Sequence, residues 1–484
     1  MQMDTSTSYD AGLLASLLSQ HHPAQQASAS SSSSDTANGQ LERRAEASYA
    51  SFNERFQVTQ QRLFERQYSH IYFDRLHALK PIVLKRAQDR WTKPAAGLPA
   101  PSFVNQLVHL EIGRRCFAVG TLYKEMTLKP SILKEIAEER DLVPQPPRAR
   151  YTSDDDFIVL EDSSGRVRLG GNFPSSELVT GDVVAVLGTE QSGGEFVVEE
   201  WLMAGPAPQP ALDTASRMRG DELDPHVAIV SGLELGKSDQ DPLALELLSE
   251  FLCGNLGGEL NKDLAASVVR VVVAGNSLFN QKELEEASKP KYMARNAVSL
   301  GLQTTQQLDS ILSNIASTCP VDVMSGPLDP TNHILPQQPL HRCLFPRAYA
   351  LQTFQTVPNP YHVAVDGVHI MGTSGQPIDD MIKFQIGDDR LALLEHTLQG
   401  RHLAPTAPDT LACFPLNADP FILESSPHVY FAANQPEFAT SVLKGEDGQS
   451  VRLVLIPTFS TTQTIVLLNL VTLECTPVCF RTIP

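Results

Sequence analysis

Two features are scarce in this sequence: cationic charge and long apolar runs. Its 484 residues include 38 Lys and Arg against 56 Asp and Glu, which gives a formal net charge of -18. This balance disfavours tight, unaided binding to a phosphate backbone, which depends on cations that displace counterions. The apolar stretch Thr464–Val471 has the length of a strand, and no run is long enough to span a bilayer.

Cysteine is also sparse, and its pattern does not suit a disulfide framework. The seven cysteines are scattered and odd in number. No hydrophobic leader follows Met1, so we expect a reduced, intracellular compartment. Hydrophobic residues make up 42% of the chain and charged residues 19%, as in ordinary globular proteins. The length then suggests two to three domains with large cores.

The first part of the chain divides into a polar tail and a region of short elements. Residues 1–45 are rich in Ser, Ala and Gln, and we expect them to be disordered because they bury too little apolar surface. Residues 46–92 are helical in pattern, and Pro81 should break or kink the helix. Five short runs rich in β-branched residues follow between 105 and 205. We therefore predict a domain over 46–212 with N-terminal helices and an OB-fold β-barrel.

The predicted barrel is acidic. Residues 151–205 hold eleven Asp or Glu against Arg166 and Arg168. OB-folds that bind single strands use basic grooves and stacking aromatics. An acidic barrel favours contacts with other proteins, so a single-strand DNA-binding protein is the weaker alternative. The barrel ends at a Pro-rich linker, Ala204–Leu212.

Strands and helices alternate in the remaining residues, 222–484. Near-continuous apolar runs such as His226–Ser231, Ala266–Ala274 and Val321–Met324 have the composition of buried parallel strands. Helix-spaced segments separate them, and later runs suggest antiparallel additions to the sheet. This pattern predicts an α/β domain over 222–484.

The loops after four predicted strands occupy the positions of the two-metal phosphoesterase motifs but lack most of their metal ligands. Such enzymes need carboxylates and imidazoles at successive strand ends, because paired cations must activate water and stabilise the leaving oxygen. The usual motifs are Asp-x-His, Gly-Asp, Gly-Asn-His-Asp and Gly-His-x-His. One surviving carboxylate of these motifs and no histidine cannot hold two divalent ions. The degenerate positions are Gly232, Glu234, Asn276, Leu328, Asp329, Asn434 and Pro436.

The last of these loops follows a predicted buried strand, Val429–Ala432. The two histidine positions of its motif hold Asn434 and Pro436. A carboxamide is a poor metal ligand beside a neutral imidazole, and a proline side chain cannot ligate. We therefore interpret Asn434 and Gln435 as hydrogen-bonding groups that fix the loop.

Domain order and several long irregular segments resemble the small regulatory B subunits of replicative DNA polymerases, most closely the second subunits of DNA polymerase delta. The segments are Gly326–Pro346, Asn359–Met381, Arg401–Pro415 and Asp419–Gln435. The resemblance covers roughly residues 46–484. It implies an OB-fold followed by a calcineurin-like phosphodiesterase sandwich domain that is catalytically inactive, with no cofactor and no metal.

The resemblance also implies a role. It predicts a non-catalytic accessory subunit, located in the nucleus, that acts in DNA replication and repair. Its partners would be the cysteine-rich C-terminal domain of the polymerase delta catalytic subunit and a third, winged-helix subunit. In several organisms such a subunit also serves the catalytic subunit of polymerase zeta. DNA contact is expected to be indirect or weak. Separately, no Lys/Arg run in the sequence has the pattern of an import signal, so import as part of a complex is the expectation.

Two further alternatives stay open. The chain could be the B subunit of another replicative polymerase, alpha or epsilon. It could also be an active metal-dependent phosphoesterase with atypical ligands, such as Glu234, Asp329 and His333. The other histidines are interpreted as surface or hydrogen-bonded core residues, because no spacing resembles a ligand set. Cys475 and Cys479 are interpreted as ordinary thiols, since no second pair accompanies them.

Overall fold

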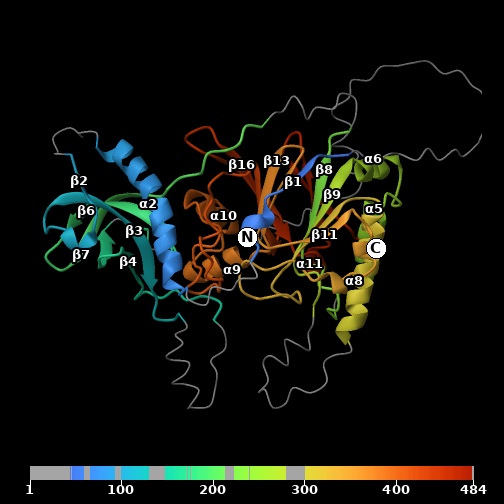
Figure 1. Cartoon of the computed structure of the whole chain (residues 1–484), viewed down its shortest axis with the longest axis horizontal. Helices are drawn as coiled ribbons and strands as arrows, with labels where there is room; N and C mark the ends of the chain where they lie inside the picture. The colour runs from blue at the N-terminus through green and yellow to red at the C-terminus, as the bar shows by residue number, and fades with distance from the viewer. Residues whose placement is uncertain are drawn as a thin grey trace, which may run out of the picture.

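The structure, a computed structural model, has two lobes built from three six-stranded sheets (Figure 1). One lobe, the barrel lobe, contains helix α2 and strands β2–β7. The other, the sandwich lobe, contains the remaining strands and helices. The predicted tail of 1–45 lies outside the described residues except for Arg44. The structure describes residue 44 and residues 46–58, 66–92, 100–129, 148–171, 173–174, 176–212, 223–238, 240–279 and 300–481.

The sheet of the barrel lobe closes on itself. Its strand order is β2-β3-β4-β5-β7-β6, and β3 also pairs with β6. Leu160, Val186 and Phe196 are among the side chains that fill the interior. The five strands that the sequence predicts are present, and the additional β2 is too short to give an alternating pattern. The strands are β2 (Ser102–Val104), β3 (Arg115–Glu125), β4 (Phe157–Glu161), β5 (Arg166–Gly171), β6 (Val183–Glu190) and β7 (Glu195–Leu202), and η3 (Leu107–His109) follows β2.

Helix α2 (Ser69–Trp91) packs on strands β3 and β6 of the barrel. Leu79, Val83 and Ala87 recur every four residues and lie buried on this face. The sequence predicted a break or kink at Pro81. The break is wrong, because the helix continues through this residue with buried side chains on both sides of it.

The sandwich lobe consists of two sheets packed face to face. The first sheet has the order β1-β12-β13-β14-β16-β15 and the second the order β11-β10-β9-β8-β17-β18. Strands β8 to β11 are parallel, as their apolar runs predict. Ile229, Val272, Val363 and Phe431 lie in the core between the sheets. The strands are β1 (Tyr49–Ser51), β8 (His226–Val230), β9 (Val268–Ala274), β10 (Val321–Met324), β11 (Phe354–Val357), β12 (Tyr361–Val365), β13 (Val368–Thr373), β14 (Val429–Gln435), β15 (Ala439–Lys444), β16 (Ser450–Pro457), β17 (Thr464–Asn469) and β18 (Cys475–Cys479).

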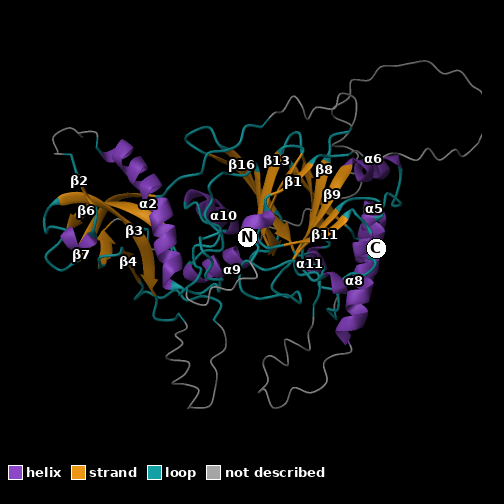
Figure 2. Cartoon of the chain, viewed as in Figure 1, coloured by secondary structure: helices purple, strands orange, loops and turns teal. Residues whose placement is uncertain are grey.

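Helices cover the outer faces of both sheets (Figure 2). Helices α5, α6 and α8 pack on the second sheet, and α9 and α10 pack on the first, on the side that faces the barrel lobe. No helix within the described ranges is long and apolar enough to cross a membrane. The helices are α5 (Pro242–Leu252), α6 (Glu259–Ser267), α8 (Leu300–Ala316), α9 (Gln376–Met381), α10 (Arg390–Gln399) and α11 (Phe459–Thr462), with short turns η2 (Asn53–Phe56), η4 (Arg342–Leu344), η5 (Ala348–Ala350) and η6 (Ile382–Phe384).

The described N-terminal segment lies on the sandwich lobe. Strand β1 pairs antiparallel with β12, and the η2 turn places Phe56 in the core beside the first sheet. The helix predicted from residue 46 is therefore wrong for this segment, since Phe52 and Phe56 belong to a loop and a short turn. The domain predicted over 46–212 is corrected at its start, because residues 46–58 belong to the other lobe.

The Pro-rich linker is held against the sandwich lobe. The Ser426 hydroxyl donates to the carbonyl oxygen of Ala207 at 2.7 Å. Gln209 Nε2 donates to the carbonyl oxygens of Pro427 and Ser450, each at 2.8 Å. The chain therefore leaves the barrel along a fixed path.

Candidate functional site

Loops that follow strands β8, β9, β10 and β14 touch one another at one end of the sandwich. Glu234 N donates to the Asn276 carbonyl oxygen at 2.9 Å and joins the first two loops. Leu328 N donates to Asn276 Oδ1 at 3.0 Å and adds the third loop. Asn434 N donates to Ser231 Oγ at 2.9 Å and adds the fourth. The structure thus brings the predicted loops together as one strand-end site.

The Asn434 carboxamide bridges this strand-end site. Its Nδ2 donates to the carbonyl oxygens of Ala274 and Ser374, at 3.3 and 2.9 Å. A Cβ added to Gly232 would lie 2.9 Å from Asn434 Oδ1. Glycine at this position of the first loop therefore leaves room for the Asn434 amide. Pro436 lies exposed beyond the end of β14. The Asn434 amide thus joins the loops directly through hydrogen bonds to carbonyl oxygens. A metal pair at this place would need carboxylates or imidazoles instead.

Asp329 is a buried carboxylate that joins the second and third loops. Its Oδ1 accepts from Ser277 N at 2.8 Å and from Leu278 N at 3.0 Å. Its Oδ2 accepts from Gly326 N at 2.8 Å. Burial raises the pKa of Asp329 to about 6, and these backbone amides act against a larger rise. A carboxylate that accepts three backbone N–H groups has few lone pairs left for a cation.

Glu234, which occupies a histidine position of the motif, is engaged in its own contacts. Its Oε2 accepts from Lys237 Nζ at 2.8 Å and from the Ser460 hydroxyl at 2.7 Å. His333 is exposed on a neighbouring loop. No three His, Cys, Asp or Glu side chains of the described residues gather closely enough to hold a metal ion. The atypical ligand set of Glu234, Asp329 and His333 is therefore not assembled.

An amide network beside this site was missed by the sequence analysis. Asn359 Nδ2 donates to the side-chain oxygens of Gln337 and Gln376, each at 2.9 Å. Its Oδ1 accepts from Ser374 N at 3.1 Å, and Gln337 Nε2 donates to the Gly326 carbonyl oxygen at 3.1 Å. Ser374 follows β13, and the polar run directly after that apolar strand is the signal that could have pointed to it. Neutral side chains thus hold the strand ends in place.

A second polar cluster, the lobe junction, lies where α2 meets the sandwich lobe. Its centre is Arg75, which is fully buried. Arg75 Nε pairs with Asp419 Oδ2 at 3.1 Å, and its two other nitrogens donate to the carbonyl oxygens of Pro405 and Ala407 at 2.7 and 2.6 Å. His402 Nε2 lies 2.8 Å from the same carboxylate oxygen. The barrel lobe therefore inserts a charge into the sandwich lobe.

The geometry settles the charge states in this cluster. His402 Nδ1 accepts from Ala404 N at 3.1 Å, so Nε2 carries the proton and the imidazole is neutral. Burial lowers the pKa of His402, and the Arg75 charge lowers it further. Burial alone would raise the pKa of Asp419, but His402 and Arg75 hold it well below its usual range. The buried ion pair is thus Arg75 with Asp419.

Further polar contacts cross the lobe junction. His396 Nε2 lies 2.8 Å from Asp182 Oδ2, and Lys124 Nζ donates to the Phe384 carbonyl oxygen at 2.6 Å. Burial alone would lower the pKa of His396, but the Asp182 carboxylate raises it above its ordinary value. The interpretation of His396 and His402 as hydrogen-bonded residues is confirmed. Their role in joining two lobes was not visible in the sequence.

Two family models match this chain. The model described as the DNA polymerase delta subunit OB-fold domain matches residues 67–201, which span α2 and most of the barrel. The model for the B subunit of DNA polymerases alpha and epsilon matches residues 227–440, which span most of the sandwich lobe. The order of the two lobes and these matches define the class, which is the B subunits of DNA polymerases.

Curated relatives narrow the class. The chain is 42% identical to the DNA polymerase delta small subunit of Oryza sativa subsp. japonica, over 91% of this chain and 99% of that protein. It is 40% identical to DNA polymerase delta subunit 2 of Drosophila melanogaster, over 86% of this chain and 94% of that protein. It is 34% identical to the DNA polymerase delta small subunit of Saccharomyces cerevisiae, over 84% of this chain and 88% of that protein. The chain belongs to the family of DNA polymerase delta small subunits, which confirms the resemblance seen in the sequence.

A distant neighbour among solved structures has a much lower similarity. It is a dimetal phosphatase from Danio rerio, with a TM-score of 0.23 and 10% sequence identity. The match covers 53% of this chain and 99% of the phosphatase. A likeness this low carries no argument about the fold or the activity of this chain.

Proposed function

We propose that this chain is a non-catalytic scaffold subunit of DNA polymerase delta. It acts in the nucleus, in DNA replication and repair. It bridges the cysteine-rich C-terminal domain of the catalytic subunit and the winged-helix domain of the third subunit. The catalytic subunit of polymerase zeta is a further partner in the same role. Membership of the polymerase delta small-subunit family supports this proposal.

The observation that carries the loss of catalysis is the bonding of the strand-end site. Asn434 Nδ2, a donor, is directed at carbonyl oxygens of two neighbouring strand ends. Asp329 accepts three backbone N–H groups, and Glu234 is held by Lys237 and Ser460. The residues present therefore do not fit a two-metal centre, which needs several free oxygen and imidazole ligands on both ions.

The bridging role draws support from the lobe junction. A scaffold must keep its binding surfaces at fixed relative positions, and a buried ion pair with satisfied donors restricts the motion of one lobe against the other. Arg75, His396 and Lys124 supply such contacts along the junction. Two lobes held in one orientation can present separate surfaces to separate subunits.

Activity assays test the first half of the proposal. Purified chain should not hydrolyse a phosphodiester or shorten DNA with Mn²⁺, Mg²⁺ or Zn²⁺ present. The matched variant is Asp329→Ala, which removes the buried carboxylate of the strand-end site. Metal-dependent turnover that disappears in this variant would show that the site is active.

Co-expression tests the second half. The chain, the catalytic subunit and the third subunit are expressed together, separated by size exclusion and identified by mass spectrometry. We expect the catalytic and third subunits to form one complex only when this chain is present. In parallel co-expressions, a complex with the alpha or epsilon catalytic subunit but not with the delta subunit would assign the chain to a different polymerase.

A further inference from the structure

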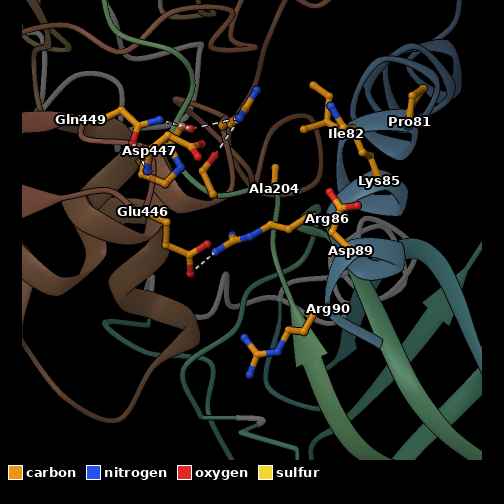
Figure 3. A pocket seen from close by; sticks show the side chains of 13 residues that line it. Pro81, Ile82, Lys85, Arg86, Asp89, Arg90, Ala204, Glu446, Asp447 and Gln449 are labelled. Carbon is orange, nitrogen blue, oxygen red and sulfur yellow. Dashed lines mark hydrogen bonds and ion pairs between the residues drawn. The ribbon is translucent and has the colours of Figure 1, made fainter. Parts of the chain in front are cut away.

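A groove opens between the two lobes, on the side of α2 that is not buried in the barrel (Figure 3). We call it the junction groove. Its volume is about 760 Å³, which falls within the usual size range of ligand sites. Helix α2 supplies one wall, and the turn between β15 and β16 supplies the other. The groove therefore exists only while the lobes keep their relative position.

Two arginines from different lobes are fixed in the groove. Arg401 Nε and one of its terminal nitrogens donate to the carbonyl oxygens of Gly205 and Pro206, at 2.7 and 3.0 Å. Arg86 donates to the Met203 carbonyl oxygen at 3.0 Å. Gly205 has a φ of +72°, which L side chains rarely adopt, and a Cβ there would displace the Arg86 guanidinium, so glycine preserves this arrangement. Both cations are thus positioned before any partner binds.

The groove carries more positive than negative charge. Its lining includes four cationic side chains against Asp89, Glu446 and Asp447. Arg86 pairs with Glu446 at 2.8 Å, but the Glu446 side chain is 75% exposed, and such pairs contribute little in water. Burial lowers the pKa of Arg401, the like charge of Arg86 lowers it further, and the Asp447 carboxylate acts against this lowering. The four cations and three acids give the lining a formal net charge of +1 in a chain of net charge -18, with Glu200 beside Arg90.

Two more cations at the rim are open to a partner. Lys85 is exposed and has no hydrogen-bond or ion-pair partner among the described residues. Arg90 faces Glu200 at 3.4 Å, and both side chains are about half exposed. Figure 3 shows Lys85, Arg86, Asp89 and Arg90 along the groove side of α2. Rim charges of this kind set the choice of partner and the rate of association more than the stability of the fold.

We propose that the junction groove binds an acidic peptide segment of another subunit in the polymerase assembly. Carboxylates of this segment pair with Arg86, Arg401 and Lys85. The three acidic residues of the lining disfavour a continuous phosphate backbone, and they can meet basic residues interspersed in a peptide. Because the occupant touches both lobes, its binding also stiffens the junction. This inference rests on the proposed function as a scaffold.

Charge reversal in the assembled complex tests the inference. Lys85→Glu combined with Arg90→Glu changes two exposed side chains that the fold does not depend on. We expect the affinity for one purified partner subunit to fall about tenfold or more at 150 mM NaCl. Lys262→Glu, an exposed change on α6 at the far side of the molecule, is the matched control and should leave the affinity unchanged.

A photo-crosslinking residue at position 85 identifies the occupant. We expect illumination of the complex to join position 85 to an acidic segment of another subunit. The inference is overturned if the charge-reversal variant binds within about twofold of the unaltered chain and position 85 cross-links to a basic segment, to DNA or to no other subunit. These outcomes are read only from complexes that have formed. A chain that forms no complex at all contradicts the proposed function, and the two failures are thereby separated.

Discussion

The strand-end site and the lobe junction use polar residues in opposite ways. At the strand ends, Asn434 and its neighbouring amides are neutral and bond mostly to backbone groups of adjacent loops. At the junction, Arg75, Asp419 and Asp182 are charged groups buried between lobes. The junction therefore depends on a buried ion pair between the lobes, whereas the bridging contacts of the strand-end site come mostly from neutral amides, with the Asp329 carboxylate held by backbone N–H groups.

This difference predicts which mutations should destabilise the fold most. A buried charge that loses its partner costs more than a neutral hydrogen bond, because the remaining ion stays desolvated. The lobe junction should thus be the most sensitive polar region of the chain. The strand-end site should tolerate changes better, and its changes should have smaller effects on stability.

The largest effect is expected for Arg75→Met. The substitution keeps an unbranched apolar side chain but leaves Asp419 without its cation, and three backbone carbonyl oxygens lose a donor. We expect the free energy of unfolding to fall by about 3–5 kcal/mol, measured by urea denaturation at pH 7.

Two further variants sharpen this test. Adding Asp419→Asn to Arg75→Met should recover part of the loss, because the unpaired charge is removed. Arg114→Met breaks only the exposed pair with Glu111 and should stay within about 0.5 kcal/mol of the unaltered chain. A loss as small for Arg75→Met as for Arg114→Met would mean that the junction does not depend on its buried charge.

A smaller effect is expected for Asp329→Ala at the strand ends. Ser277, Leu278 and Gly326 would each be left with a buried backbone N–H that has lost its acceptor. The expected loss is about 1–3 kcal/mol in the same urea experiment. Asp388→Ala, at an exposed carboxylate, serves as the control and should change little. A loss above that of Arg75→Met would reverse the comparison between the two regions.

The sequence predicted the barrel, the sandwich strands and the degenerate loops because each depends on local pattern. Strand β10 lies at the predicted residues, and the loops after β8, β9 and β14 follow apolar runs that are visible in the sequence. The segment that carries β1 was assigned to a helix, since its pairing partner β12 is more than 300 residues away. Pattern within a short window cannot report such a contact.

The lobe junction was hidden for the same reason. Arg75 looks like any polar residue on an amphipathic helix, and Asp419 like any loop carboxylate. They are separated by 344 positions in the chain and meet only in the fold. The cost of burying an unpaired charge explains why both must be present, but it does not tell a reader of the sequence which residues are partners.

Asn434→Ala should have a moderate effect, below that of Asp329→Ala. It removes the bonds to Ala274 and Ser374 but leaves carbonyl oxygens, which tolerate the loss of one partner better than N–H groups. We expect a loss of about 1 kcal/mol in urea denaturation. Complex formation with the polymerase subunits should be unchanged, as size exclusion can show. A loss of assembly without a loss of stability would instead place this loop in a partner interface.

The smallest effect concerns the pH dependence of the junction. The Asp182 carboxylate raises the pKa of His396 in the folded chain above the value of about 6.5 for an unfolded histidine. A raised pKa contributes stability that is complete below pH 6.5 and is lost as the pH rises through the folded value. The urea midpoint should therefore fall as the pH is raised from 6 to 8. His396→Gln keeps a donor toward Asp182 but cannot titrate, so its midpoint should fall less over this interval. Equal slopes for the two chains would show that this contact is neutral throughout, which would leave Arg75 and Asp419 as the charged core of the junction.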